Sequence, residues 1–563
     1  GGGIDSPRPA SQRAAAFILT AAMLTTLAAP AFAKTWYIEN GDITISAGKD
    51  GNDVTQNENT TYGDKDTVIT NQDRDTASSN TVTIEAKDED DKVEVKLDNV
   101  NIDTSKQNKA AVSVTGSGDT TIELDGDNKL KSGSAHAGLE HNKTDTSGEL
   151  TIQDNDKNGS LKAAGGQYGA GIGGAGVNDA QVKITGGKIT ATGGEYGAGI
   201  GGGFKGSGDV TISGGEIHAN GGNYGAGIGG GDYSSGKVTI SGGEINATGG
   251  YLGAGIGGGE KGRGDVTITG GEITSATGGN YGAGIGGGKE GRGDVTIEGN
   301  TEVNAAGGAG GAGIGGGYVA KNNSNQITIK SNENGSPTVN AVGGSRDKTT
   351  KFGGAGIGAG GDSTATTDIT LEGKVTINAT AGKDNAAIGA NGIEQEFPGL
   401  AGGTSITRKD SDKNDISPLP GDNVPDTDTP SGGGSTGGDS TGGDSAGGDS
   451  AGGGSSGGGS ADASVQESVF PGLVVTDKDG QRISYTSTQS GNTLTVCVGR
   501  FTASFRISLA ALRQLRAEGI ETITFQTILC STTLSVDELL AMGGEDAEAV
   551  LTHRSTDSSL TVG

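Results

Sequence analysis

The stretch Tyr196-Gly-Ala-Gly-Ile-Gly-Gly-Gly203 returns almost unchanged along the middle of the chain. Further copies, some of them altered, begin at Tyr168, Tyr224, Leu252, Tyr281 and, in a shortened form, Gly311. The central isoleucines of these copies are spaced by 28, 28, 28, 29 and 29 residues. Self-similarity at a period of this length indicates a repeat architecture, in which each repeat forms one structural unit.

Each repeat holds two more short apolar segments, of which Val210-Thr-Ile212 and the Gly-Gly-x-Ile step ending at Ile217 are examples. Valine and isoleucine two positions apart point to one side and threonine to the other, which is the period of a β-strand. Three mini-strands joined by glycine turns make one triangular coil, and stacked coils pair at ~4.8 Å. The predicted fold is therefore all-β, a right-handed parallel β-helix with three short strands per ~28-residue coil.

The composition supports a thin, repetitive structure. The chain has 563 residues, of which 113 are glycine and only 31% are hydrophobic, too few for a thick globular core. The formal net charge of −28 argues against a nucleic-acid partner, because a phosphate backbone is held by clustered lysine and arginine.

Short alternating segments extend the pattern on both sides of the regular repeats. We predict irregular β-helix coils over 34–160, with Trp36, Tyr37 and Ile38 in an N-terminal capping coil, and regular Gly-rich coils over 161–405. The upstream segments that alternate apolar and polar residues are 42–45, 81–84, 93–97, 100–102, 111–114 and 121–124.

The first 33 residues are typical of a secretory signal peptide. Arg8 and Arg13 precede an apolar run, and Ala31-Phe-Ala33 is a small-x-small cleavage site. We therefore expect a secreted or cell-surface protein with no membrane span after cleavage, because no other stretch is long and apolar enough to cross a bilayer.

Composition changes again after the repeats. Residues 406–465 contain a proline-containing segment followed by a Gly/Ser/Asp-rich segment, which predicts a disordered linker, and residues 466–563 have ordinary composition. Strand-like segments, with Ser508 and Ser535 as helix N-caps, predict a small α+β module there. Cys497 and Cys530 are the only cysteines, and an exported chain would hold them either as one disulfide or as two thiols.

The tyrosine column formed by the repeats is the main candidate binding feature. Stacked phenol rings at coil spacing would form a platform on which sugar rings lie, or would simply stabilise the stack by packing. A second, mostly polar column precedes the tyrosines and carries groups suited to sugar hydroxyls. The predicted carbohydrate-binding residues are Tyr168, Tyr196, Tyr224, Tyr281, Glu195, Asn223 and Asn280.

No motif in the chain predicts catalysis, a metal site or a cofactor. Gly169-Ala-Gly-Ile-Gly-Gly174 matches a dinucleotide fingerprint, but it recurs in every coil without a following helix, so we interpret it as turn geometry. The tripeptides Arg263-Gly-Asp265 and Arg292-Gly-Asp294 resemble integrin ligands, yet their Gly-Asp pairs are also expected at a turn before a strand. The four histidines form no ligand cluster in the sequence.

The segments Val93-Glu-Val-Lys-Leu-Asp-Asn-Val-Asn-Ile102, Ala110-Ala-Val-Ser-Val114 and Thr121-Ile-Glu-Leu-Asp-Gly-Asp-Asn128, followed by Gly-rich coils, resemble a known family. They are similar to the secreted "carbohydrate-binding domain-containing" β-solenoid proteins of Gram-positive gut bacteria, over residues 80–405. The resemblance implies the location and the fold, and it transfers no binding residues.

Two hypotheses remain open from the sequence. The first is a non-catalytic binding or adhesive solenoid whose partner is a glycan, mucin or cell-wall polysaccharide. The second is a structural spacer that displays the C-terminal module, and a polysaccharide-degrading enzyme is a distant third.

Overall fold

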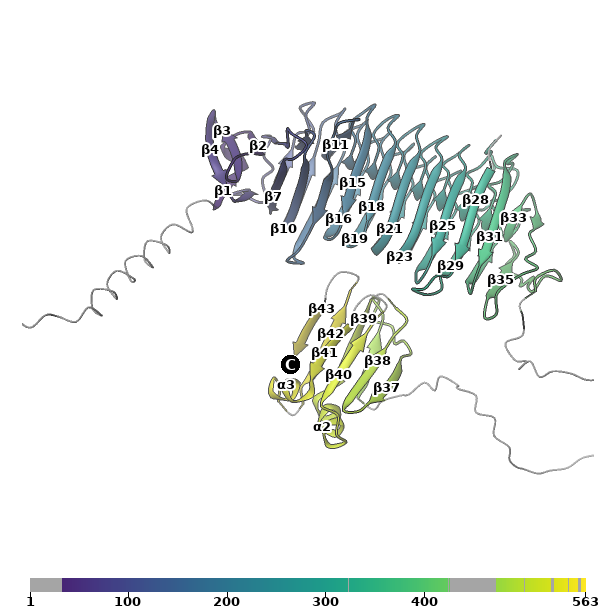
Figure 1. The fold of residues 1–563 in the computed structure, drawn as a ribbon. Helices are drawn as coiled ribbons and strands as arrows, with labels where there is room; N and C mark the ends of the chain where they lie inside the picture. Colours follow the sequence, from purple (N-terminus) through teal and green to yellow (C-terminus); the bar gives the residue numbers. More distant parts are fainter. Residues whose placement is uncertain are drawn as a thin grey trace, which may run out of the picture. The chain divides into compact units, whose positions relative to one another are not determined.

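The structure is a computed structural model that describes residues 33–321, 324–423, 425, 472–500, 502–527, 531–544, 546–554 and 558–563. The chain divides into two compact units, one ending at Val424 and the other beginning at Pro425 (Figure 1). The predicted signal peptide, apart from its last residue, and the Gly/Ser/Asp-rich part of the predicted linker lie outside the described residues.

The first unit is a stack of coils with three faces, and within each face the strands of successive coils pair in parallel. This confirms the predicted parallel β-helix (Figure 1). The first face is built by the Ala-Gly-Ile-Gly motif, whose isoleucines pair in parallel from coil to coil, for example Ile200 with Ile228. Its strands are β6 (Val82–Glu85), β9 (Val112–Thr115), β11 (Leu139–Lys143), β14 (Ile172–Gly173), β17 (Ile200–Gly201), β20 (Ile228–Gly229), β22 (Ile256–Gly257), β24 (Ile285–Gly286), β27 (Ile314–Gly315), β30 (Ile357–Gly358) and β33 (Ile388–Ala390).

The second face carries the Val-Thr-Ile segments, with valine and isoleucine buried and threonine half-buried on the outer side. Its strands are β5 (Asp66–Thr70), β7 (Lys92–Asp98), the first part of β10 (Asp119–Lys131), β12 (Leu150–Gln153), β15 (Asp179–Ile184), β18 (Gly208–Ile212), the first parts of β21 (Gly236–Thr248) and β23 (Gly264–Thr277), β25 (Gly293–Glu298), β28 (Ser324–Lys330) and β31 (Thr366–Glu372).

The third face follows the Gly-Gly-x-Ile step. Where a coil grows from 28 to 29 residues, β23 absorbs the extra residue in an irregularity, so that Ile245 pairs with Ile273 while Asn246 pairs with Ser275. The strands of this face are β8 (Asn101–Asp103), the second parts of β10, β21 and β23, β13 (Gly159–Ala164), β16 (Lys188–Thr192), β19 (Glu216–Asn220), β26 (Glu302–Ala306), β29 (Thr338–Val342), β32 (Thr376–Thr380) and β35 (Ser405–Lys409).

The N-terminal end of the stack is closed around Trp36 as predicted, but the residues that follow include an antiparallel meander in place of predicted β-helix coils. Strand β1 (Ala33–Tyr37) pairs with β5, the 3-10 helix η1 (Ile38–Asn40) follows, and β2 (Ile43–Ala47), β3 (Asn52–Gln56) and β4 (Asn59–Asp64) form an antiparallel meander. Trp36 is buried, and its indole Nε1 donates a hydrogen bond of 2.9 Å to Asp64. An antiparallel meander at this end leaves fewer strand edges open for pairing with another chain.

The C-terminal end corrects the predicted boundary at residue 405. Strand β35 pairs in parallel with β32, and the short strand β34 (Ile393–Glu394) turns back on β33. The first unit continues through residue 423, because Arg408 of β35 is completely buried and binds Asp422. Residues 406–423 therefore belong to the solenoid rather than to a linker.

The second unit is a small α+β module, as predicted. Ser508 and Ser535 cap α2 (Leu509–Ala517) and α3 (Val536–Ala541) by accepting hydrogen bonds from Ala511 N and Glu538 N. One sheet contains β36 (Leu473–Thr476), β39 (Ala503–Ser508), β42 (Glu548–His553) and β43 (Ser558–Val562), and the other contains β37 (Thr486–Ser490), β38 (Thr493–Cys497), β40 (Thr522–Gln526) and β41 (Ser531–Ser535).

One strand pairing in the described part of the module is parallel, whereas the others are antiparallel. Strands β38 and β40 pair in parallel because α2 lies in the crossover between them. Cys497 lies at the end of β38 and its thiol contacts Gln526, whereas Cys530 is outside the described residues, so the disulfide stays a prediction. None of the helices in the described parts of the chain has the length and apolar character needed to cross a membrane.

Candidate functional site

Three of the predicted tyrosines form a regular ladder at the corner that precedes the first face. Each lies four residues before the isoleucine of β14, β17 or β20. The rings of Tyr168 and Tyr196 are 5.2 Å apart between centroids and inclined by 8°, and those of Tyr196 and Tyr224 are 5.1 Å apart and inclined by 7°. We call Tyr168, Tyr196 and Tyr224 the tyrosine ladder; all three side chains are half-buried.

The fourth predicted tyrosine does not belong to this exposed ladder. Tyr281 is only 8% exposed and packs with Leu252 and Tyr318 in an apolar cluster, against which Tyr224 of the ladder also packs. Tyr281 therefore does not extend the exposed ladder, because its neighbours cover the ring, and its role in binding stays a prediction. The predicted tyrosine column is therefore half-buried from Tyr168 to Tyr224 and buried from Leu252 to Tyr281.

The close stacking also changes how the ladder would meet a sugar. Rings 5.1–5.2 Å apart leave no room for a sugar between them, so the ladder presents ring edges and hydroxyl groups rather than ring faces. The exception is the outer face of Tyr168. The pairing of Leu139 with Ile172 places Ala135, with only a methyl group, at the corresponding position of the preceding coil.

Phe204 supports the ladder from one side. Its ring meets Tyr168 and Tyr196 edge-on, with centroid distances of 5.6 Å and 5.3 Å. The backbone N–H of Phe204 donates to the carbonyl of Tyr168. Phe204 was not predicted from the sequence, although its place directly after a Gly-Gly-Gly motif, four residues beyond a core isoleucine, was a usable signal.

A polar column runs beside the ladder, and we define it as Gln167, Glu195, Asn223, Tyr251 and Asn280. Glu195 is half-buried and the other members are exposed. The amide of Gln167 donates a hydrogen bond of 3.0 Å to Glu195 in the next coil, which shows that the two side chains lie in line. The predicted residues Glu195 and Asn223 therefore lie beside the ladder, and Asn280 lies further along the same column, beyond the ladder.

Two buried carboxyl groups, which were not predicted from the sequence, lie behind the ladder. The backbone N–H groups of Asp232 and Glu260 donate to the carbonyls of Tyr196 and Tyr224. The two side chains are 2% and 8% exposed, and Oδ1 of Asp232 has no hydrogen-bond partner among the described residues. Burial, followed by the charge of Glu260, raises the pKa of Asp232 to about 6.

This elevated pKa predicts a pH-dependent effect of Asp232→Asn. The ordinary pKa is 3.8, so the folded state binds a proton more tightly than the unfolded state; the resulting stability is complete below pH 3.8 and is lost as the pH rises to about 6. At pH 8 we expect the variant to be more stable than the wild type by about 3 kcal/mol, and the difference to vanish near pH 4. Urea unfolding between pH 4 and pH 8 measures both.

Asp362→Asn is the matched control, because Asp362 is exposed and has a φ of 51°, a conformation that asparagine also tolerates. At pH 8 this variant should match the stability of the wild type to within about 0.5 kcal/mol. A wild type more stable than Asp232→Asn at pH 8 would contradict the argument.

The Arg-Gly-Asp tripeptides have a structural role in the second face. Gly264 pairs with Gly293 at the start of the strands, where both are buried. The guanidinium of Arg263 binds Asp294 of the next coil at 2.5 Å and lies 3.7 Å from Asp265. These ion pairs, one within a coil and one between coils, give Arg263 and Asp265 a structural role that does not require an integrin receptor.

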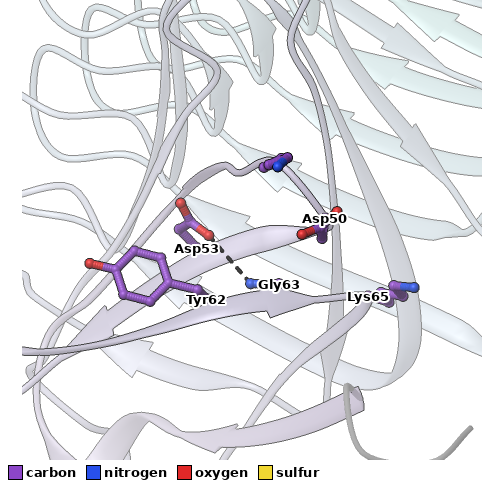
Figure 2. Close-up of a pocket in the computed structure, with 6 residues that line it drawn as sticks. Asp50, Asp53, Tyr62, Gly63 and Lys65 are labelled. Carbon is purple, nitrogen blue, oxygen red and sulfur yellow. Dashed lines mark hydrogen bonds between the residues drawn. The ribbon is translucent and has the colours of Figure 1, made fainter. Parts of the chain in front are cut away.

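A separate cavity of about 320 Å³ lies in the N-terminal cap (Figure 2). Figure 2 shows Asp53 turned toward Gly63, whose N–H donates to Asp53 Oδ1 at 3.3 Å. Tyr62 is 73% exposed at its rim. Lysine and aspartate side chains both line the cavity, so it carries no single charge; its residues are Lys49, Asp50, Asp53, Tyr62, Gly63 and Lys65.

The described histidines of the solenoid also have local partners. His136 Nδ1 lies 2.9 Å from Glu140, and His141 is buried with its ring nitrogens near the carbonyls of Val114 and Gly148. Burial lowers the pKa of His141, so this ring is neutral near pH 7. Within the described ranges, no three His, Cys, Asp or Glu side chains are grouped so as to hold a metal ion.

Comparison with known families supports the fold. A family model described as a beta helix repeat matches five successive coils, at residues 182–204, 210–232, 238–260, 266–289 and 295–318. Together with the coil geometry, this match places the central part of the chain in the class of parallel β-helix repeat proteins. The comparisons with curated proteins and with solved structures gave no match.

Proposed function

We propose that this protein is a secreted or cell-surface, non-catalytic solenoid that binds carbohydrate, as in adhesion to glycan, mucin or cell-wall polysaccharide. The observation that carries the proposal is the row of ladder hydroxyls. In the described structure no group hydrogen-bonds to the hydroxyls of Tyr168, Tyr196 or Tyr224, and an exposed polar column runs beside them. Rows of free donors and acceptors beside aromatic rings suit sugar hydroxyls.

The secreted location rests on the residues before the solenoid. The basic residues, apolar run and Ala31-Phe-Ala33 site are typical of an export signal. The family resemblance of residues 80–405 points to the same location, and the net charge of −28 argues against a partner with clustered phosphates.

A spacer role is the second candidate. The chain divides at Val424 and Pro425, and the Gly/Ser/Asp-rich segment 431–460 separates the solenoid from the C-terminal module. A solenoid of stacked coils would hold such a module away from a surface.

The test replaces the three ladder tyrosines by phenylalanine in the mature chain, residues 34–563. Phenylalanine keeps the stacked rings and removes only the hydroxyls, so the fold should persist while glycan retention weakens by about tenfold or more, as expected for several lost hydrogen bonds. Depletion from solution by a polysaccharide and mucin panel measures retention, and released reducing ends are scored in parallel.

Tyr62→Phe makes the same chemical change at an exposed tyrosine of the cap and should leave retention unchanged. If the wild type is retained by no glycan, the binding proposal fails and the spacer role stands. Release of reducing ends would instead identify an enzyme.

A further inference from the structure

We propose that the glycan is a linear, extended, neutral β-1,4-linked polysaccharide that lies parallel to the solenoid axis with one sugar beside each coil. This inference rests on the proposed function and names its substrate class. The ladder rings are 5.2 Å and 5.1 Å apart. In an extended chain of pyranoses joined by equatorial 1,4-linkages, each sugar adds nearly the same length. The reason is that the chain enters and leaves each ring at opposite ends.

The type of linkage matters because the sugar spacing must match the coil spacing over several coils. A β-1,4-linked chain stays straight and keeps its sugars in register with a straight stack. An α-1,4-linked chain of the same sugars curls, since one of its linkage bonds is axial, and it would leave the ladder after one or two coils. The solenoid therefore discriminates between polymers of the same composition by their shape.

The polar column repeats in the same register as the ladder from Gln167 to Tyr251. Asn280 follows in the next coil, where Tyr281 N donates to the carbonyl of Ala309 instead of that of Tyr251. Backbone hydrogen bonds keep the column aligned: Tyr196 N donates to the carbonyl of Gln167 at 3.0 Å, Tyr224 N to that of Glu195 at 3.1 Å, and Leu252 N to that of Asn223 at 2.8 Å. Each coil thus offers a chemically related side chain at one sugar's spacing.

Both ends of this row present aromatic surface. Tyr168 begins the ladder with only Ala135 in front of it. At the other end Leu252 is buried and interrupts the hydroxyl row, while Tyr251 is 51% exposed and rests edge-on against Tyr281, with a centroid distance of 5.7 Å. An exposed aromatic ring at each end suits the apolar face of a sugar.

The surrounding charges select against acidic polysaccharides. Glu195 lies in the polar column, and Asp232 and Glu260 are buried directly behind the ladder. Lys289 Nζ lies 3.9 Å from Glu260, and the charges of Lys205 and Lys261 act on Asp232, so these lysines offset much of the local negative charge. The net charge of −28 over the whole chain remains. Carboxylated or sulfated sugars would be repelled here, whereas neutral hexoses and N-acetylated amino sugars would not.

The experiment measures the affinity of the mature chain for oligosaccharides of increasing length by isothermal titration. One series is β-1,4-linked glucose, one is β-1,4-linked N-acetylglucosamine, and one is α-1,4-linked glucose. For at least one β-series we expect Kd to fall by about tenfold or more up to about five sugars and then to level off. The α-series should gain little affinity beyond two sugars and should bind about tenfold more weakly than that β-series at five sugars. The two β-series distinguish a plain glucan from an amino-sugar polymer.

Asn223→Ala removes the central group of the polar column and should flatten the dependence on length. Asn220→Ala is the matched control, since Asn220 is an exposed asparagine of the same coil on the third face. Equal binding of α- and β-linked chains, or affinity independent of length, would overturn this inference while retention of mucin or branched glycans would still support the proposed function. Retention of no glycan would overturn both.

Discussion

Gly222→Ala is expected to break the coil stack at its centre. A Cβ at this position would lie well inside van der Waals contact with the carbonyl oxygen of Gly194 in the preceding coil. Backbone atoms cannot move aside as a flexible side chain can, so the two coils would have to separate. Overpacking of this kind destabilises by about 3 kcal/mol or more. Thermal unfolding of the mature chain, followed by far-ultraviolet circular dichroism, measures the loss.

A glycine occupies the equivalent position in every regular coil, so the loss of stability should be large. Gly250 faces Gly222 in the same way, and Gly279 faces Gly250. Gly399→Ala is the matched control, because a Cβ there meets nothing within 4 Å. We expect it to change stability by less than about 0.5 kcal/mol. Equal melting of Gly222→Ala and Gly399→Ala would contradict the stacking geometry.

Arg408→Ala is the second substitution with a large expected effect. The Arg408 side chain is completely buried; its guanidinium lies 3.0 Å from Glu394 and 3.0 Å from Asp422, and it donates to the carbonyl of Gln395 at 2.8 Å. Alanine would leave buried carboxylates without their partner, which costs about 3–5 kcal/mol. The C-terminal end should open first, because each coil is held only by its neighbours.

Hydrogen exchange locates this opening. Amides of β32 and β35 should lose protection in Arg408→Ala, while those of central coils such as β18 keep it. Lys409→Ala changes the adjacent exposed residue of the same strand and should leave the exchange pattern unaltered. Uniform loss of protection along the solenoid, or none, would show that the arginine does not hold the end in place.

The strands and faces of the solenoid could be predicted because a stacked coil must return to the same register. Ile200 lies against Ile228 only if the intervening residues close one full turn, and this requirement appears in the sequence as a constant spacing. Predicted segments such as 93–97 and 111–114 coincide with β7 and β9 to within a residue. The helix caps Ser508 and Ser535 could also be predicted from the sequence, because capping is a local interaction.

The solenoid boundary was missed because it depends on a contact distant in sequence. Residues 406–423 have the proline and aspartate content of a linker, and nothing in that composition shows that Arg408 inserts between Glu394 and Asp422. Buried ion pairs of this kind form only after the chain has turned back on itself.

The candidate site was predicted in part. The tyrosine and polar columns followed from the repeat, which places equivalent residues one above another. Which column members are accessible did not follow, because Tyr281 is covered by Leu252 and Tyr318, residues that break the pattern. Asp232 and Glu260 were also overlooked, since each occupies a position that varies from coil to coil and is drawn against the ladder only by the stacking.

The sequence by itself determined the coil, its three strands and the order of the columns. The reason is that strand pairing between successive coils requires a nearly constant number of residues per coil. The tertiary structure alone decided which tyrosines present their hydroxyls, how the rings stack at 5.1–5.2 Å and where the solenoid ends. Exposure, ring geometry and end-capping depend on side chains from neighbouring coils and turns, and those neighbours come together only when the stack forms.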